Sequence, residues 1–281
     1  MPKLLVIFHI YYQDQVPYFL EHLANITCPY DLIVTSAKLS SCVEQQLRAF
    51  KPDIKIIQVS NRGYDMWPFL QAIYQTDLSQ YTYVLKLHTK QLSALSAIKL
   101  TGQPLLWRDC LLQPLLGSRQ IFEHNLHLLQ QAGVGLCAGY FCFLQRGFSL
   151  PEDTYLYDRL CNTLHCHHSS RWFVAGSMFL IRTSCLEKLK AIPFTQQDFS
   201  PLSKSGSSST LAHALERIFV PLVLEKNLKV HPAGYPNPSY SWQTYLQYYR
   251  YQLLYILTTG QRKIHYDIKR RDLRLCLKGK I

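Results

Sequence analysis

The start of the chain alternates between short apolar runs and segments whose hydrophobic residues recur at helical spacing. Leu4–Phe8 is a continuous apolar run, which is typical of a buried strand. The hydrophobic residues that follow recur mostly every three or four positions, which predicts a helix with one apolar face. These residues are Val16, Phe19, Leu20 and Leu23. A strand followed by a helix is the unit that the next segments repeat.

The same alternation continues through the first ninety residues. Further strands are predicted at Asp31–Ser36, Asp53–Val59 and Tyr81–His88, and helices at Ser41–Phe50 and Met66–Tyr74. Strands that alternate with helices predict an α/β fold with a parallel, Rossmann-like sheet. In such sheets ligands bind at the carboxyl ends of the strands, so the segments that follow each strand are the candidates for chemistry.

The middle of the chain is mostly helical from Pro104 to Gln131, and a further strand is predicted at Val134–Ala138. Arg171–Arg182 is predicted to be one long central strand. The polar segment Ser203–Thr210 is typical of a connector. It leads into a helix predicted over Leu211–Phe219.

The chain changes character beyond His231, where PAGYPNPSYSW predicts a turn-rich linker. We therefore expect one domain over residues 1–235 and a helical appendage over 236–281. Hydrophobic and aromatic residues of Tyr240–Leu257 recur mostly every three or four positions and predict one apolar helical face. From Arg250 to Ile281 nine Lys or Arg stand against two Asp, a local charge of 9 − 2 = +7. This combination favours contact with an anionic membrane surface, and a helix packed on the main domain is the alternative.

Composition supports a packed globular core, because 48% of residues are hydrophobic and 17% are charged. The net charge of +12 indicates an anionic partner, either a nucleotide diphosphate, a membrane surface or a nucleic acid. Nucleic acid is the weakest of the three because no recognition motif accompanies the basic residues.

Nine cysteines are scattered along the chain without a CxxC pair, which favours a reducing compartment. The apolar run at the N-terminus lacks the features of a secretory signal, and no run approaches the ~18 apolar residues of a membrane span. A cytoplasmic protein is therefore expected. The cluster of Cys161, His165, Cys166, His167 and His168 matches no standard zinc spacing, so no metal site is predicted there.

Asn61, Gly63 and Asp65 follow the third predicted strand, where a ligand loop belongs. Gly63 permits a positive φ or a close approach of backbone to ligand. Asn61 and Asp65 supply polar groups for a ribose or sugar hydroxyl. The alternative is a simple strand-to-helix turn in which Asp65 caps the next helix.

Lys86, His88 and Lys90 end the fourth predicted strand. Side chains alternate along a strand, so these three would share one face. Three cationic groups on one face are suited to binding a diphosphate. The alternative is a solvated strand face, which the apolar residues around Lys86 disfavour.

Two further segments carry polar residues in apolar surroundings. Arg108 lies in a predicted helix and pairs either with a phosphate or with the neighbouring Asp109. Gly176 and Ser177 interrupt an apolar strand that ends at Arg182, which indicates either close backbone approach to a ligand or tight packing.

The predicted helix Leu211–Phe219 places His213 and Glu216 on one face, since they are three residues apart. Arg217 lies four residues after His213. A glutamate with such neighbours is suited to act as a general base. The alternative is an ion cluster on the helix surface.

Together these segments resemble the rhamnan synthesis F family of bacterial polysaccharide glycosyltransferases. The similar stretches occur in order over residues 61–219, and the tail after about residue 235 is not covered. They are NRGYDMWPFL (61–70), LKLHTK (85–90), WRD (107–109), AGSMFLIR (175–182) and LAHALERIF (211–219).

The resemblance implies a GT-A-like sheet and transfer of rhamnose or a related sugar from a nucleotide-diphosphate donor to a cell-surface polysaccharide or lipid-linked glycan, with inversion at the sugar. The expected setting is O-antigen (lipopolysaccharide), capsule or cell-wall polysaccharide assembly at the inner membrane face. It implies Glu216 as the base, with His213 second. The implied donor site combines the residues introduced above, namely Asn61, Gly63, Asp65, Lys86, His88, Lys90, Arg108, Ser177, Arg182 and Arg217. The chain has no Asp-x-Asp motif, which puts a divalent metal in doubt and keeps a non-catalytic, glycan- or partner-binding subunit as the alternative function.

Overall fold

The computed structural model describes residues 3–90, 92, 94–99, 104–139, 142–145, 151–166, 170, 172–199 and 210–233. The predicted boundary at 235/236, the appendage over 236–281, most of the connector Ser203–Thr210, and His167 and His168 lie outside these residues. None of the helices within the described ranges combines the length and the apolar character that crossing a bilayer needs.

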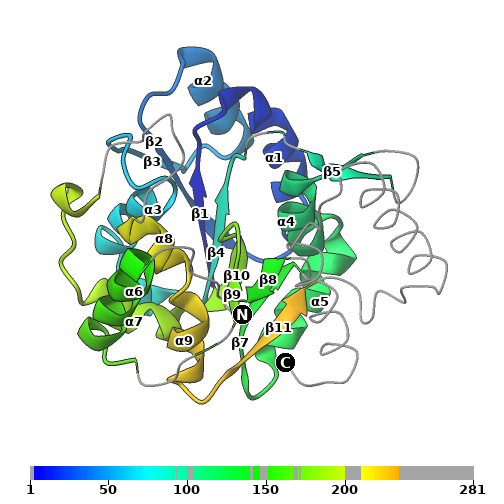
Figure 1. The fold of residues 1–281 in the computed structure, drawn as a ribbon. Coiled ribbons are helices and arrows are strands. Elements are labelled where there is room, and N and C mark those ends of the chain that lie inside the picture. The colour runs from blue at the N-terminus through cyan, green and yellow to red at the C-terminus, as the bar shows by residue number, and fades with distance from the viewer. Residues whose placement is uncertain are drawn as a thin grey trace.

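A seven-stranded sheet forms the centre of the molecule (Figure 1). In their spatial order its strands are β11 (Lys229–Ala233), β7 (Val134–Gly139), β10 (Phe179–Arg182), β4 (Tyr83–His88), β1 (Leu4–His9), β2 (Tyr30–Ser36) and β3 (Lys55–Gln58). All neighbours pair in parallel except β10, which is antiparallel to both β4 and β7. Six carboxyl ends therefore meet at one edge of the sheet, together with the start of β10. The predicted α/β architecture is confirmed.

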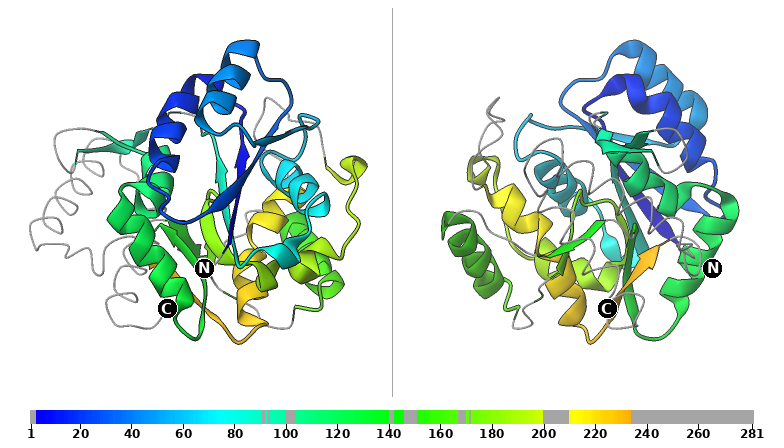
Figure 2. Two further views of the ribbon diagram at one scale, coloured as in Figure 1. Left: turned by 180° about the vertical axis from the view of Figure 1, so that it is seen from behind. Right: turned by 45° about the vertical axis from the view of Figure 1, so that its right-hand side comes forward.

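Helices cover both faces of this sheet (Figures 1 and 2). On one face lie α1 (Val16–Leu23), α2 (Ser41–Phe50), α4 (Trp107–Leu116) and α5 (Arg119–Gln130). On the other lie α3 (Met66–Tyr74), α6 (Pro151–Thr163), α7 (Glu187–Lys190), α8 (Leu211–Glu216) and α9 (Phe219–Leu224). All six residues of β1 are buried. Cover on both faces explains why this strand is a continuous apolar run instead of an alternating one.

Short elements complete the described chain. Two small antiparallel sheets pair β5 (Ala94–Lys99) with β6 (Pro104–Leu106) and β8 (Phe143–Gln145) with β9 (Trp172–Val174). The 3-10 turns are η1 (Gln13–Gln15), η2 (Leu78–Gln80), η4 (Thr183–Leu186) and η5 (Gln196–Asp198).

The predicted long strand Arg171–Arg182 is wrong. β9 ends at Val174 and β10 begins at Phe179, and the two strands belong to different sheets. Between them Gly176 and Ser177 have φ values of +77° and +46°, which are left-handed and end the extended conformation. The apolar character of the segment hid a turn that carries the site described below.

The predicted helix Leu211–Phe219 is divided. α8 ends at Glu216 and α9 begins at Phe219. Pro221 has no backbone N–H, and its ring excludes the carbonyl of the residue four positions earlier, which is Arg217. In a new helix that starts at Phe219, Pro221 falls in the first turn, where no N–H is needed.

Two further segments contain strands where the sequence predicted a helix or a linker. The segment predicted as mostly helical from Pro104 begins with β6 before α4 starts at Trp107. The prediction of a turn-rich linker directly beyond His231 is wrong for Pro232 and Ala233, because both belong to β11, and the rest of that segment lies outside the described residues. β11 is the edge strand of the sheet, where Pro232 is tolerated without a ladder hydrogen bond on its free side.

Candidate functional site

Lys86 and His88 lie at the carboxyl end of β4 with both side chains buried, at 1% and 3% exposure. They point towards the face of the sheet that α3 covers, since the Lys86 ammonium lies 5.4 Å from the ring centroid of Phe69 on α3. Phe179 on the adjacent strand contributes a second ring at 5.9 Å. An ammonium in such apolar surroundings requires a counter-charge.

Asp65 supplies this counter-charge from the loop between β3 and α3. The Lys86 ammonium donates to Asp65 Oδ2 and also to the hydroxyl and the carbonyl oxygen of Ser177, at 3.0 and 3.1 Å. The Ser177 hydroxyl in turn donates to Asp65 Oδ2 at 2.6 Å. Three segments that are far apart in the sequence therefore meet in one closed hydrogen-bonded network.

The network fixes the charges of its members. Burial alone would raise the pKa of the Asp65 carboxyl, but the neighbouring Lys86 ammonium and the hydrogen bonds from Lys86 and Ser177 hold it well below its usual range. Burial lowers the pKa of Lys86, and its ion pair with Asp65 opposes this. We assign the pair as carboxylate and ammonium at neutral pH.

The alternative interpretation of Asp65 as a capping side chain is not what the structure shows. Asp65 occupies the position before the first turn of α3, yet its side chain makes no capping hydrogen bond there. Gly63 and Tyr64 before it have φ values of +63° and +53°, and a Cβ on Gly63 would lie 2.5 Å from Phe199 Cδ1. This turn therefore requires glycine at position 63 and directs Asp65 to the network instead of to the helix.

Glu216 lies on the other side of the Gly176–Ser177 turn. Its Oε1 accepts a hydrogen bond from the backbone N–H of Gly176 at 2.6 Å, and Arg217 Nη1 lies 3.8 Å from Oε2. The side chain is 20% exposed. Burial raises the pKa of the Glu216 carboxyl, while the Gly176 N–H and Arg217 act in the opposite direction. A partly accessible carboxyl with a raised pKa is suited to accept a proton from a hydroxyl group.

His213 and Arg217 surround Glu216 but have structural partners. The His213 ring bonds through Nδ1 to the Thr210 hydroxyl at 3.0 Å and lies 5.4 Å from the Tyr64 ring. Arg217 donates to the carbonyl of His213 at 2.7 Å, and its guanidinium lies 4.7 Å from the ring centroid of Phe173. Both residues lie close to Glu216 along α8 and its C-terminal end, as the predicted helix implied.

His88 is neutral, and within the described part of the chain its ring nitrogens have no hydrogen-bond partner. Its Nδ1 lies 3.5 Å from Asp65 Oδ2, but burial lowers the pKa of the imidazole well below its ordinary value. Nearby His9, which no sequence motif marks, bonds through Nδ1 to the Thr35 carbonyl at 3.1 Å. Burial lowers the pKa of His9 to about 4.

Lys90 is the cation of the predicted trio that remains available. Its backbone is tied to Gln15, whose amide donates to the Lys90 carbonyl at 2.6 Å. The Lys90 charge lowers the pKa values of Lys86, His88 and Glu216, so it lies within electrostatic range of all three. Within the described ranges no carboxylate forms an ion pair with Lys90. The predicted clamp of three free cations is therefore reduced, since Lys86 is committed to Asp65 and His88 is neutral.

The loop after β1 joins the same edge of the sheet. The Thr89 hydroxyl accepts hydrogen bonds from the backbone N–H groups of Tyr11 and Tyr12, both at 2.9 Å. Tyr11 is 50% exposed, and its backbone is bonded to Thr89, the residue before Lys90. No sequence motif marked these tyrosines, because their position depends on the pairing of β1 with β4.

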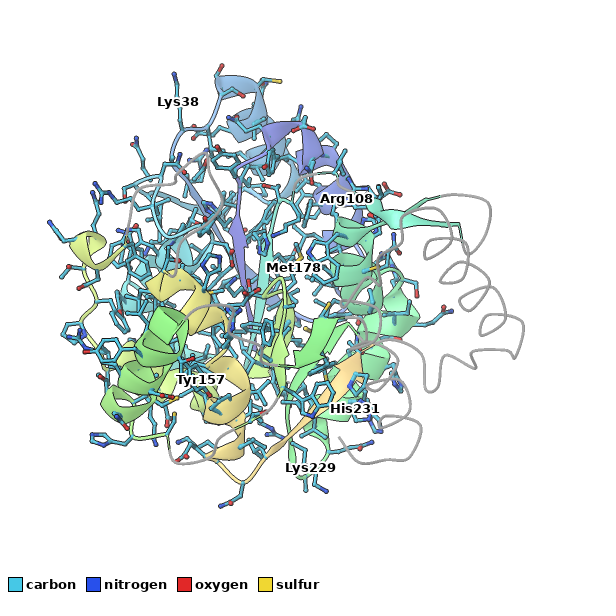
Figure 3. All side chains as sticks on the ribbon, in the orientation of Figure 1. Lys38, Arg108, Tyr157, Met178, Lys229 and His231 are labelled. Atoms are coloured by element: carbon cyan, nitrogen blue, oxygen red, sulfur yellow. The ribbon has the colours of Figure 1, made fainter. Side chains whose placement is uncertain are left out.

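Two predicted site residues lie elsewhere or have other partners. Arg182 is at the far end of β10, where it pairs in register with Tyr83, and it donates to the carbonyls of Val134, Leu129 and Gln131 at 2.6, 2.5 and 3.1 Å. Arg108, labelled in Figure 3, bonds to Asp109 at 2.9 Å and lies 3.5 Å over the Tyr18 ring. The interpretation of Arg108 as the partner of an acidic neighbour is therefore the one observed. Asn61 is exposed at the site loop.

The described residues do not form a metal site. Within those ranges no three His, Cys, Asp or Glu side chains come together as ligands. The carboxylate nearest the end of β4 is Asp65, and its Oδ2 is taken by Lys86 and Ser177. A hard divalent cation would compete there with a buried ammonium, so no step of the chemistry is assigned to a metal.

Two curated relatives, both named "Uncharacterized protein WxcX", come from strains of Xanthomonas campestris pv. campestris. The chain is 26% identical to one over 224 residues and 25% identical to the other over 240 residues. Each match covers 77% of this chain and 30% of the relative. The chain therefore spans less than a third of the length of these relatives.

Similar solved structures include TarS residues 1–349 of S. aureus, with a TM-score of 0.44 and 13% identity over 96% of this chain and 69% of that one. The mannosyltransferase PcManGT from Pyrobaculum calidifontis, in complex with GDP-Man and Mn²⁺, has a TM-score of 0.45 and 13% sequence identity. That match covers 98% of this chain and 70% of the mannosyltransferase chain. These likenesses are too weak to assign a function. The family profile described as Rhamnan synthesis protein F matches residues 1–228, and the chain belongs to that family.

Proposed function

We propose that this protein is a glycosyltransferase that moves a sugar from a nucleotide-diphosphate donor to a hydroxyl group of a glycan. The observation that carries the proposal is Glu216, a partly accessible carboxyl with a raised pKa at the carboxyl edge of an α/β sheet. A single hydrogen bond from Gly176 N–H holds its Oε1. Membership of a family named for rhamnan synthesis supports a sugar polymer as the product class.

The proposed reaction is a displacement at the anomeric carbon of the donor. Glu216 accepts the proton of the acceptor hydroxyl as its oxygen forms the new bond to the anomeric carbon. The bond from that carbon to the diphosphate oxygen breaks, and the electron pair leaves with the nucleoside diphosphate. The proposal is inversion, because one base and one displacement suffice and, among the described residues, the other carboxyl of the site, Asp65, is held by Lys86.

The leaving diphosphate gains negative charge, and Lys90 is the group we assign to stabilise it. Lys90 is unpaired within the described ranges and its charge reaches the neighbourhood of Glu216. Tyr11 presents an exposed ring at the same edge, which suits stacking on the base of the nucleotide. Asn61 and Gly63 remain proposed contacts of the donor, with Asn61 exposed on its loop.

The finer assignments rest on the family name and on the sequence. We propose rhamnose or a related sugar as the transferred group and a cell-surface polysaccharide or lipid-linked glycan as the acceptor. We also propose that transfer does not require a divalent metal, because Lys90, which has no ion-pair partner within the described ranges, is the cation we assign to the donor diphosphate. Loss of transfer in a chelator, restored by Mg²⁺ or Mn²⁺, would contradict this.

The Glu216→Gln variant tests the proposal. Glutamine keeps the hydrogen bond from Gly176 but cannot accept the proton, so transfer should fall about 10²–10⁴-fold while donor binding is kept. The assay uses a panel of nucleotide sugars with a glycan acceptor, and calorimetry measures nucleoside diphosphate binding. Wild-type transfer by the variant would eliminate Glu216 as the base. A wild-type protein that binds a nucleotide sugar or glycan without transferring it would favour the alternative, a non-catalytic binding subunit.

We further propose a cytoplasmic protein that is held at an anionic membrane face by residues 236–281. The supporting observation is the sequence charge of +7 between Arg250 and Ile281, at about 1 kcal/mol per basic residue near an anionic bilayer. A chain that ends at Ser239 should lose co-sedimentation with anionic vesicles. Equal binding by the truncated and full chains, or by neutral vesicles, would rule this out.

A further inference from the structure

We propose that Lys86 is a positioning residue for Glu216 and not a ligand of the donor diphosphate. Together with Asp65 it fixes the turn at Gly176 and Ser177, and this turn holds the Glu216 carboxylate. The inference rests on the proposed function only in taking Glu216 as the base. Its structural content, that Lys86 controls the environment of the Glu216 carboxyl, can be measured without any transfer reaction.

The hydrogen-bond capacity of Lys86 is used up inside the protein. An ammonium has three donor hydrogens. Lys86 has three acceptors, which are Asp65 Oδ2, the Ser177 hydroxyl and the Ser177 carbonyl. With the side chain 1% exposed, no donor hydrogen remains for a phosphate and no surface remains for it to approach.

Consecutive residues of one turn connect Lys86 to Glu216. Ser177 receives Lys86, and the N–H of the preceding residue, Gly176, donates to Glu216 Oε1 at 2.6 Å. The direction of that N–H is set by the backbone angles of the turn. The Lys86 ammonium bonds to both the carbonyl and the hydroxyl of Ser177, the residue after Gly176. These two bonds fix Ser177 and therefore the direction of the Gly176 N–H.

The turn needs such support because its conformation is unfavourable. Gly176 and Ser177 are both left-handed, with φ values of +77° and +46°, and serine adopts that region only at a cost. On its other side the turn is packed tightly, since a Cβ on Gly176 would lie 2.6 Å from Leu111 Cδ2 and 3.2 Å from Trp107 Cζ2. The turn is therefore fixed between the packed residues of α4 and the buried ion pair.

This arrangement explains why a buried ion pair stands beside the proposed base. The Gly176 N–H lowers the pKa of Glu216 against the effect of burial. If the turn relaxes and this hydrogen bond weakens, the carboxyl should become more basic and less well placed. The predicted signature is an upward shift of the Glu216 pKa with a lower kcat and an unchanged affinity for the nucleotide.

The cleanest test is Ser177→Ala, because it removes a hydroxyl of the network without changing any charge. The double variant Asp65→Asn/Lys86→Met removes both charges together and so keeps the net charge of the network. Ser36→Ala is the matched control, since Ser36 is also buried at this edge of the sheet but donates to the Ile10 carbonyl, at 2.7 Å. Thermal melting should first establish that each variant is folded.

The pKa of Glu216 is measured by carbon NMR of labelled glutamate carboxyls in the full chain, with Glu216→Gln to assign the signal. We expect it to rise in Ser177→Ala and to rise further in the double variant, and to stay unchanged in Ser36→Ala. Where transfer is measurable, kcat should fall about 10-fold in Ser177→Ala, as for loss of one hydrogen bond, and the acidic limb of its pH profile should move to higher pH.

Calorimetry with UDP, GDP and dTDP separates the two roles of Lys86. Unchanged nucleotide affinity with a shifted Glu216 pKa supports positioning. Weakened affinity in the double variant with an unshifted Glu216 pKa would overturn the inference and return Lys86 to the donor site. An unshifted pKa in both folded variants would also overturn it. If the wild type binds and transfers nothing, the proposed function fails, but the NMR titration still decides whether Lys86 positions Glu216.

Discussion

The two edges of the central sheet use cations in different ways. At the carboxyl edge Lys86 is buried against a carboxylate, and a second carboxyl, Glu216, lies across the adjoining turn. At the amino edge the acceptors of Arg182 among the described residues are all backbone carbonyls, and Arg182 borders a groove with Lys190, whose ammonium bonds to the Thr76 carbonyl. Both Lys86 and Arg182 take part in the pairing of β4 with β10.

The difference lies in what each cation leaves behind when it is removed. Loss of Arg182 frees carbonyl groups near the surface, where water can replace the guanidinium. Loss of Lys86 leaves the Asp65 carboxylate buried without a counter-charge. The buried charge–charge interaction between Lys86 and Asp65 therefore lies at the carboxyl edge, where each charge depends on the other. Substitutions at the two edges should separate these effects.

The largest change in stability is expected for Lys86→Met. A buried carboxylate that loses its partner typically costs about 3–5 kcal/mol, and Asp65 is in that position. The free energy of unfolding in urea should fall by this order. The double variant Asp65→Asn/Lys86→Met should recover a large part of the loss, because no isolated charge remains. Equal losses in the single and double variants would show that packing, and not charge, dominates at this edge.

A smaller effect is expected from pH. The pKa of His9 is about 4 in the folded protein, against about 6.5 when unfolded, so between these values the unfolded chain binds a proton that the folded chain does not. Stability therefore falls as pH falls from about 6.5 to about 4, by roughly 3 kcal/mol for this group. The pKa of His88 is also lowered by burial, so His88 likewise reduces stability as the pH falls.

The His9→Gln variant should show a shallower loss of stability over this pH range in urea unfolding curves. His127→Gln serves as a control because His127 is an exposed histidine on α5. An identical pH dependence in His9→Gln and wild type would show that His9 titrates normally in the folded protein and would contradict the buried, neutral assignment.

The smallest change is expected at the amino edge, for Arg182→Leu. Its three hydrogen bonds to carbonyls are partly exposed, so the loss of unfolding free energy should be about 1–3 kcal/mol. Transfer per folded molecule should not change, since Arg182 lies at the opposite end of β10 from Ser177. A selective loss of nucleotide affinity in this variant would return Arg182 to the donor site and remove the contrast between the edges.

Much of the sheet could be predicted from the sequence because its strands are covered on both faces. β1 and β7 are continuous apolar runs, and the predicted strands there match within a residue. The break between β9 and β10 could not be predicted, because the residues on both sides of Gly176 and Ser177 are apolar. The two left-handed φ values that separate the strands leave no trace in hydrophobic periodicity.

The candidate site divides in the same way. Asp65, Lys86, Ser177 and Glu216 were each marked by their residue type and by their place next to a strand or on a helix. The roles of these residues could not be predicted, since nothing in the sequence favours a bond from Lys86 to Asp65 over one to a phosphate. His9 and Tyr11 were missed because their position depends on the pairing of β1 with its neighbours β2 and β4.

The sequence by itself determined the alternation of strands and helices, the edge of the sheet where chemistry would lie, and the residue types gathered there. Periodicity and strand ends are local properties. Strands that are buried on both faces are continuous apolar runs, which can be recognised in the sequence. Only the tertiary structure decided which charges neutralise each other. Asp65 and Ser177 are separated by 112 positions, and the hydrogen bond between them exists because the antiparallel β10 brings its first residues to the carboxyl end of β4.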